Sequence, residues 1–198
     1  MGNVKGIELL VQAHAYLRRT VAAVPEQAWG AATPCSEWTV RQVLNHARLD
    51  QQAYGAAVTG DGWPESDSFK PADALSGDAR TELDAVLRRV ADVYAALPAD
   101  AEQVPTPLGP LPLPLAAAAA AMDAGVHAWD IAVATGLDMP LDEEMADGIW
   151  AAAERLADHL RDAYGVFAPV REVSEGPSRA EALLAFLGRD PHWAAPAS

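Results

Sequence analysis

The stretch from Leu113 to Thr135 constrains the fold most, because it is apolar around its whole circumference when drawn as a helix. It is rich in alanine, the residue with the highest intrinsic helix propensity, and Gly136 follows it as a typical helix cap. A helix without a polar face has to be surrounded by other elements. The sequence therefore predicts a buried central helix over residues 113–135 with further helices packed around it.

Five other segments show helical patterns. Apolar residues recur every three to four positions in two of them, which are amphipathic and stop near Pro25 and Pro98. Thr39 with Gln42 forms a capping box at the start of another, and a Ser–Glu pair does the same for a short C-terminal helix. The predicted helices cover residues 7–24, 39–59, 83–97, 113–135, 142–164 and 178–187.

These patterns predict an all-α protein with one domain over residues 1–198. Strand patterns are weak, although residues 166–173 could form a short extended piece. The proline-rich stretch 98–114 predicts an extended crossover between two helices. We expect a four-helix bundle with this crossover and a short C-terminal helix, an architecture in which side chains from facing helices often build metal sites.

Composition excludes several partners. A formal net charge of −14 without a local Lys/Arg cluster disfavours nucleic acid and anionic membranes. There is no apolar run of membrane-spanning length and no signal-like N-terminus, so we expect a cytoplasmic protein. The single cysteine, Cys35, forms no internal disulfide; buried packing is its expected use, and a reactive thiol near a helix start is the alternative.

Asp123, His127 and Asp130 interrupt the apolar helix at spacings that place them on one face. A buried carboxylate needs a partner, a hydrogen bond or a metal. Asp123 could simply pair with His127 one turn away, or the two could ligate a metal. Asp130 could orient the imidazole of His127 or be an ordinary capping or surface carboxylate.

A third ligand would favour the metal site, and His46 on the second predicted helix is the best candidate. Two imidazoles and one carboxylate form a ligand set that leaves coordination positions open for water or substrate. His14 and His159 could line the same cavity, but core packing is the expected role of both. Sequence spacing alone leaves the structural pair and the metal site both open.

Three motifs carry a resemblance to a known family: "TPCSEWTVRQVLNHARLD", "VHAWDIAVATG" and "LLAFLGRDP". The chain resembles the actinobacterial branch of the DinB/YfiT-like superfamily, and within it the maleylpyruvate isomerase N-terminal domain group. The resemblance implies a four-helix bundle in which His46, Asp123 and His127 bind a divalent metal, usually zinc, with Ni²⁺ or Fe²⁺ as alternatives. Asp123 stands where the isomerase has Glu.

The resemblance also implies a function. Relatives use mycothiol, a small thiol, as cofactor or co-substrate, which points to a mycothiol-dependent transferase or isomerase acting on a small electrophile. The isomerase carries a further C-terminal domain, for which we expect this chain to be too short, so an S-transferase is favoured. Arg48 and Arg171 are candidates for holding an acidic substrate. The alternatives are a non-catalytic bundle that binds a metal or small ligand, and a metal-free structural bundle; the superfamily also often forms homodimers.

Overall fold

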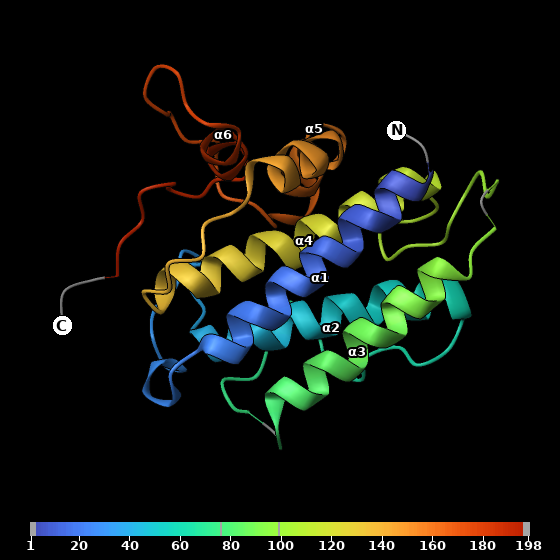
Figure 1. Ribbon diagram of the computed structural model, residues 1–198, viewed down its shortest axis with the longest axis horizontal. Helices are drawn as coiled ribbons and strands as arrows, with labels where there is room; N and C mark the ends of the chain where they lie inside the picture. The colour runs from blue at the N-terminus through green and yellow to red at the C-terminus, as the bar shows by residue number, and fades with distance from the viewer. Residues whose placement is uncertain (1–2, 76, 99, 196–198) are drawn as a thin grey trace.

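The computed structural model describes residues 3–75, 77–98 and 100–195, and over these residues the chain consists of helices and loops (Figure 1). The described residues contain no β-strand, only isolated bridges between Ala32 and Thr39 and between Val104 and Leu111. The all-α prediction is therefore confirmed. The helices are α1 (Asn3–Ala23), α2 (Val40–Thr59), α3 (Ala79–Ala95), α4 (Leu113–Ala134), α5 (Glu143–Tyr164) and α6 (Arg179–Phe186), with a 3-10 turn at Glu26–Ala28.

Helices α1 to α4 form the bundle, and α4 lies against both α1 and α2 (Figure 1). All but four of the residues in α4 are buried, as its apolar sequence predicts. Helices α2 and α4 run in opposite directions, so the first half of α2 faces the second half of α4. This arrangement brings the polar residues of α4 next to those of α2.

The loop after α2 is a long crossover that sequence patterns did not predict. The described part of residues 60–78, which leaves out residue 76, runs back along α2, where Asn45 donates to the backbone oxygens of Ala72 and Ala74 at 2.8 and 2.9 Å. As a result α3 starts beside the beginning of α2, and the two helices are parallel. The crossover also forms part of the wall of the site described below.

The proline-rich connection behaves in part as expected. It joins α3 to α4 across one end of the bundle, but it is not fully extended. The backbones of Val104 and Leu111 exchange hydrogen bonds of 2.7 and 3.0 Å, which folds the segment into a short hairpin-like loop. Residue 99 of this stretch lies outside the described residues.

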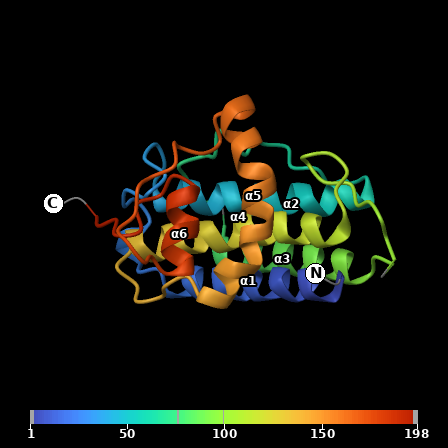
Figure 2. The same cartoon turned by 90° about the horizontal axis from the view of Figure 1, so that it is seen from above.

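Helices α5 and α6 lie side by side across the bundle, at a steep angle to α4 (Figure 2). Four of the five long predicted helices therefore form the bundle, and the fifth covers one of its faces. The extended piece expected at residues 166–173 forms no strand; it is an irregular segment in which the Arg171 amide donates to Ala185 O at 3.0 Å. This segment and the loop after α6 close over one end of α4.

The helix boundaries follow the caps in the sequence. Thr39 and Ser178 each form the predicted capping box, and the Asp142 carboxylate accepts from the amides of Glu144 and Met145. Gly165 ends α5 with a positive φ of 65°, a conformation that suits glycine. Local sequence therefore sets these helix ends. Helices α1 and α3 begin four residues before their predicted starts, at Asn3 and Ala79, and the Asp78 side chain caps α3.

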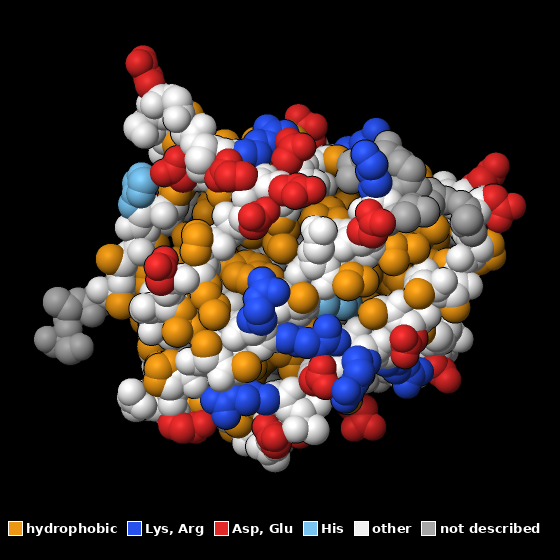
Figure 3. All heavy atoms as spheres, viewed as in Figure 1, with side chains coloured by type: hydrophobic (Ala, Val, Ile, Leu, Met, Phe, Trp, Pro, Cys, Tyr) orange, Lys and Arg blue, Asp and Glu red, His pale blue; other side chains and the backbone are white. Residues whose placement is uncertain are grey.

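Charge is unevenly distributed on the surface. On the face in Figure 3, basic side chains gather over α1 and α3, and acidic side chains lie over α5 and α6. Arg18 and Arg88 on the basic side both pair with Asp84, at 2.7 and 2.8 Å. Among the described residues, no helix combines the length and the apolar character needed to span a bilayer.

Candidate functional site

His46, Asp123 and His127 lie together between α2 and α4, as the sequence predicted for a metal site. One ligand atom from each of the three lies within 4.8 Å of the others. Asp123 Oδ1 is 3.7 Å from His46 Nε2 and 3.6 Å from His127 Nε2. The Asp123–His127 distance is too long for a hydrogen bond but within the range of an ion pair, so the structural pair and the metal site both remain compatible with this geometry.

Both imidazole rings are held by their other nitrogen. His46 Nδ1 lies 2.8 Å from the backbone oxygen of Ser68, which can only accept, so Nδ1 carries the proton. His127 Nδ1 likewise donates to Asp130 Oδ2 at 2.9 Å. When the rings are neutral, the lone pair of each Nε2 therefore faces Asp123.

Asp123 is held from the opposite side. Gln51 Nε2 donates to Asp123 Oδ2 at 2.8 Å and to the backbone oxygen of Ala120 at 2.9 Å. Gln51 Oε1 is in turn 2.8 Å from His14 Nε2, and both side chains are fully buried. The amide orientation of Gln51 is thus fixed, and Asp123 Oδ1 is left free to face the histidines.

The pKa values of the three clustered residues are shifted by burial and by one another. Burial and the nearby Asp50 carboxylate raise the pKa of Asp123 to about 7. Burial and the charge of His127 lower the pKa of His46 to about 4. Burial lowers the pKa of His127, but its bond to Asp130 and its contacts with Cys35 and Asp123 outweigh this and raise it to about 10. A cation at His127 Nε2 would therefore have to displace a proton.

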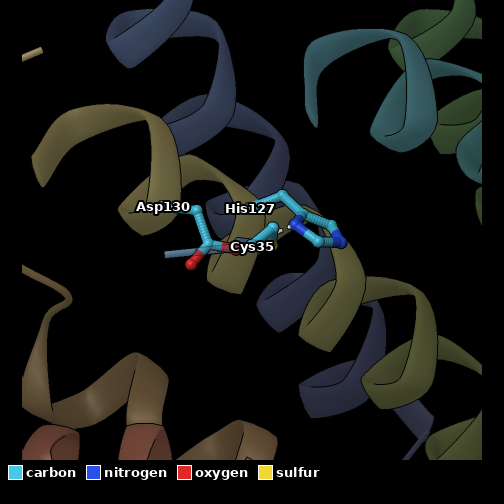
Figure 4. A group of neighbouring side chains, drawn as sticks. All are labelled: Cys35, His127 and Asp130. Atoms are coloured by element: carbon cyan, nitrogen blue, oxygen red, sulfur yellow. Dashed lines mark hydrogen bonds and ion pairs between the residues drawn. The ribbon is translucent and has the colours of Figure 1, made fainter. Parts of the chain in front are cut away.

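Asp130 is the centre of a second, deeper cluster (Figure 4). It is fully buried, so it is neither a capping nor a surface carboxylate. Burial raises its pKa, but Arg189 and His127 outweigh this and hold the pKa well below the usual range. Arg189 Nη2 lies 3.0 Å from Asp130 Oδ2, and Cys35 Sγ donates to the same oxygen at 3.2 Å. Cys35, His127 and Asp130 form a second group of potential ligands that shares His127 with the first.

The first cluster opens into a cavity of about 560 Å³. Its walls come from the loop before α2, from α2 and α4, and from the crossover after α2. The loop between α3 and α4, the end of α5, and the segments after α5 and α6 complete them. The centroids of the Trp38 and His46 rings lie 4.6 Å apart. A small molecule in this cavity would therefore contact the His–Asp cluster directly.

Other predicted residues lie outside this site. His159 is exposed on α5 and stacks edge-on with Tyr164, and His14 is buried behind Gln51. Neither Arg48 nor Arg171 lines the cavity, and Arg171 pairs with Asp190 at 3.6 Å. The cavity therefore gives no support to the suggestion that these arginines hold an acidic substrate.

Four residues that contact the His–Asp cluster or Asp130 were not predicted from the sequence: Asp50, Gln51, Ser68 and Arg189. Asp50 Oδ2 is 3.6 Å from His46 Nε2, and the i,i+4 spacing of His46 and Asp50 could have revealed it. Gln51 follows Asp50 directly and is a polar residue on a buried part of α2. Arg189 is distant in sequence and gave no local signal, apart from its place in the quoted C-terminal motif.

The fold and the site define a class: helical-bundle proteins in which two histidines and a carboxylate from neighbouring helices face a cavity. Residues 10–132 match the family described as the mycothiol maleylpyruvate isomerase N-terminal domain. The chain belongs to this family. The superfamily resemblance drawn from the sequence motifs agrees with this match.

Two uncharacterized proteins from two strains of Mycobacterium tuberculosis are each 30% identical over 170 residues, which is 85% of this chain and 89% of each relative. Among known structures, the mycothiol-dependent maleylpyruvate isomerase superposes with a TM-score of 0.65 at 16% identity, covering 97% of this chain and 91% of that one. A histidine-to-alanine mutant of the isomerase gives a TM-score of 0.57 at 17% identity, covering 77% and 68%. At these identities the structural matches establish a shared fold.

The larger superposition bears on the C-terminal region. Because it covers 91% of that isomerase chain, it disagrees with our expectation that this chain is too short for the C-terminal part of the isomerase. The expected lack of that C-terminal part is therefore no longer a reason to favour an S-transferase over an isomerase. Thiol transfer and isomerisation are both compatible with this fold.

Proposed function

We propose that this protein is a divalent-metal-dependent enzyme that uses mycothiol as cofactor or co-substrate in the transfer or isomerisation of a small electrophile. Zinc is the metal that the ligand set favours. The observation that carries the proposal is the convergence of His46 Nε2, His127 Nε2 and Asp123 Oδ1 at the wall of a cavity. Family membership supplies the thiol.

The geometry of the three residues fits a metal. Two ligands of a tetrahedral zinc ion with bonds of about 2.0–2.1 Å lie roughly 3.4 Å apart. The distances from Asp123 Oδ1 to the two Nε2 atoms are 3.7 and 3.6 Å, so a small closure would bring them into range. The hydrogen bonds on both Nδ1 atoms also fix the tautomers that a metal site requires.

When bound, a divalent ion supplies a Lewis acid that lowers the pKa of a thiol or water in its open position. The chain contributes charge and proton handling around that position. Asp123 adds negative charge, and Asp130 and Ser68 hold the imidazoles. The Asp50 carboxylate is 26% exposed and its Oδ2 lies 3.6 Å from His46 Nε2, so it is placed beside the cluster to accept the proton that a thiol loses.

We infer that sulfur, and not water, enters the open position. Zinc is borderline-soft and takes thiolate readily, so an abundant cellular thiol competes well with water. A thiolate also attacks an electrophile without a further base. The buried groups His14 and Asp130 are occupied by Gln51 and Arg189, and Asp50 could take a proton from water as well as from a thiol. The preference for sulfur therefore rests on the softness of zinc and on the abundance of the thiol.

Metal analysis tests the first part of the proposal. Protein purified without a metal-binding tag should contain roughly one divalent ion per chain, and His46→Ala and His127→Ala should each lose it. His159→Ala is the matched control, because this exposed histidine belongs to neither group of potential ligands and does not line the cavity. Full metal occupancy in the double His46→Ala/His127→Ala variant would refute the site.

Turnover tests the second part. Metal-loaded protein is incubated with mycothiol and a panel of electrophiles, beside thiol-free samples. Thiol-dependent product formation is expected. Equal rates without thiol would refute the thiol mechanism, and no turnover with any panel member would favour a bundle that binds metal and small ligands without catalysis.

A further inference from the structure

Charged side chains around the cavity are unevenly divided. Three acidic residues, Glu37, Asp50 and Asp123, line it, and Arg189 is the one Lys or Arg side chain among its described lining residues. The cluster of His46 and His127 is assigned above to a metal. Apart from a bound metal ion, Arg189 is therefore the group on which recognition of an anionic substrate would depend.

Arg189 is already fully engaged. Its Nη2 and Nε donate to the two oxygens of Asp130 at 3.0 and 3.4 Å, and its Nη1 donates to the backbone oxygen of Leu187 at 3.1 Å. The side chains of Arg189 and Asp130 are 9% and 0% exposed, so this ion pair is sheltered from water. A substrate carboxylate could take Arg189 only by removing it from the buried Asp130 carboxylate, which would keep His127 Nδ1 at 2.9 Å and the Cys35 thiol at 3.2 Å as partners. Removing one partner from a buried charge is unfavourable.

Large apolar side chains gather at the mouth of the cavity, beside the exposed Ser36 and Glu37. Phe69, Leu108 and Tyr164 line the mouth and are 58, 40 and 68% exposed, although they come from three separate segments of the chain. Trp38, Val126 and Phe167 extend the apolar wall toward the His–Asp cluster. Exposed large apolar side chains gathered around a concave site are typical of a surface that a ligand covers.

We propose that the electrophile of this protein is uncharged and apolar, and that the cavity discriminates against carboxylates such as the dicarboxylates of small organic acids. This inference rests on the proposed function, because it assumes that the cavity beside the His–Asp cluster takes the substrate. It assigns Phe69, Leu108 and Tyr164 as residues that determine specificity. With a divalent ion held by His46, Asp123 and His127, the three carboxylates of Glu37, Asp50 and Asp123 still exceed the charge of the ion by one, which adds repulsion against anions.

Maleate and its dimethyl ester form a matched pair for the test, since they share one carbon skeleton and differ in charge. Thiol addition to the ester forms a carbon–sulfur bond at one alkene carbon and breaks the π bond. The thiol proton ends on the other alkene carbon, so no further reactant is needed. Binding of each compound to metal-loaded protein without thiol is measured by calorimetry, and consumption is measured with mycothiol present.

The ester is expected to bind at least about tenfold more tightly than maleate. Leu108→Arg places an unpaired cation at the mouth and should shift the preference toward maleate, whereas Leu108→Gln, which adds no charge, should not. Leu108 is 40% exposed, so both variants should fold. Maleate binding as tightly as the ester to the unaltered protein would overturn the inference.

The two proposals fail in different ways. Selective ester binding without thiol-dependent consumption of either compound would refute the proposed function and support the inference about the cavity. Thiol-dependent consumption with a preference for maleate would support the proposed function and overturn the inference.

Discussion

Gln51 donates a hydrogen bond of 2.8 Å to Asp123, although the two residues lie 72 positions apart in the sequence. This bond occupies Oδ2 of Asp123, and the other oxygen faces His46 and His127. Because Gln51 is itself fixed by His14 and by the backbone of Ala120, the orientation of a proposed metal ligand depends on residues that do not touch the metal position. Partners of this kind tune both metal affinity and stability.

Replacing Gln51 tests this relationship. Gln51→Leu should lower metal affinity about tenfold, because loss of a partner of a metal ligand typically costs 10- to 100-fold. It should also destabilise the protein by roughly 1–3 kcal/mol, since Asp123 Oδ2 and His14 Nε2 lose their hydrogen bonds. A competitive chelator titration measures affinity. Gln52→Leu is the control, because Gln52 bonds only to Gly62 O on the surface, and equal losses in both variants would refute the role of Gln51.

The two carboxylates of α4 should respond in opposite ways. Asp123→Asn should weaken metal binding more than Asp130→Asn, because Asp123 supplies charge to the metal position directly. Asp130→Asn should cost more stability, on the order of 3–5 kcal/mol, because it leaves Arg189 as a buried unpaired charge. Metal-free Asp123→Asn should lose no stability at pH 8, where the raised pKa of Asp123 makes its ionised form costly. Urea unfolding measures the stability of each variant, and a chelator titration measures its metal affinity. If the same variant were the more impaired in both measurements, this assignment would be contradicted.

His14 should make stability pH-dependent. Burial lowers its pKa from 6.5 to about 4, so the folded protein keeps His14 neutral where the unfolded chain already binds a proton. Above pH 6.5 His14 is neutral in both states and costs no stability. As the pH falls toward 4, the unfolded chain binds a proton that the folded protein does not. The free energy of unfolding therefore falls, by roughly 2–3 kcal/mol at pH 4.5. His14→Gln should remove this part of the decline. Free energies of unfolding at pH 7.5 and 4.5 are compared with those of His159→Gln, which should decline like the unaltered protein; an equal decline in His14→Gln would count against the prediction.

Cys35 distinguishes the two potential ligand groups that share His127. If the metal lies among His46, Asp123 and His127, then Cys35→Ser should keep the full metal content, and its hydroxyl can still donate to Asp130. External thiol should also still support turnover. Elemental analysis compares the metal content of Cys35→Ser with that of His46→Ala. Loss of metal in Cys35→Ser but not in His46→Ala would place the metal among Cys35, His127 and Asp130 instead.

Gly188 holds the chain in the position that delivers Arg189 to Asp130. It has a φ of 80°, and an added Cβ would lie 2.5 Å from the backbone oxygen of Ala168. Gly188→Ala should therefore destabilise the protein by more than the roughly 1–2 kcal/mol that a left-handed conformation costs a non-glycine residue. Gly165→Ala is the matched control, because Gly165 has a similar φ of 65° and open space around it. Thermal unfolding compares the two, and equal shifts would show that the contact with Ala168 relaxes freely.

Sequence by itself determined the local features of this protein. The helix boundaries follow from apolar periodicity and from caps such as Thr39 and Asp142, which act within one or two turns of the chain. The burial of α4 follows from its composition, and the shared face of Asp123, His127 and Asp130 follows from helical geometry. His46 was placed in the same candidate site from its residue type and helix, and its proximity to Asp123 agrees with that prediction.

Tertiary structure alone decided how these parts meet. The 60–78 crossover and the steep angle of α5 depend on which apolar faces pack together, a choice that local periodicity does not encode. That packing brings Arg189 to Asp130 across 59 residues and Gln51 to Asp123 across 72, and it leaves Arg48 and Arg171 outside the cavity. The chemistry of the site therefore depends on long-range contacts, because burial sets which charges must be paired and only the folded chain determines which residues are buried together.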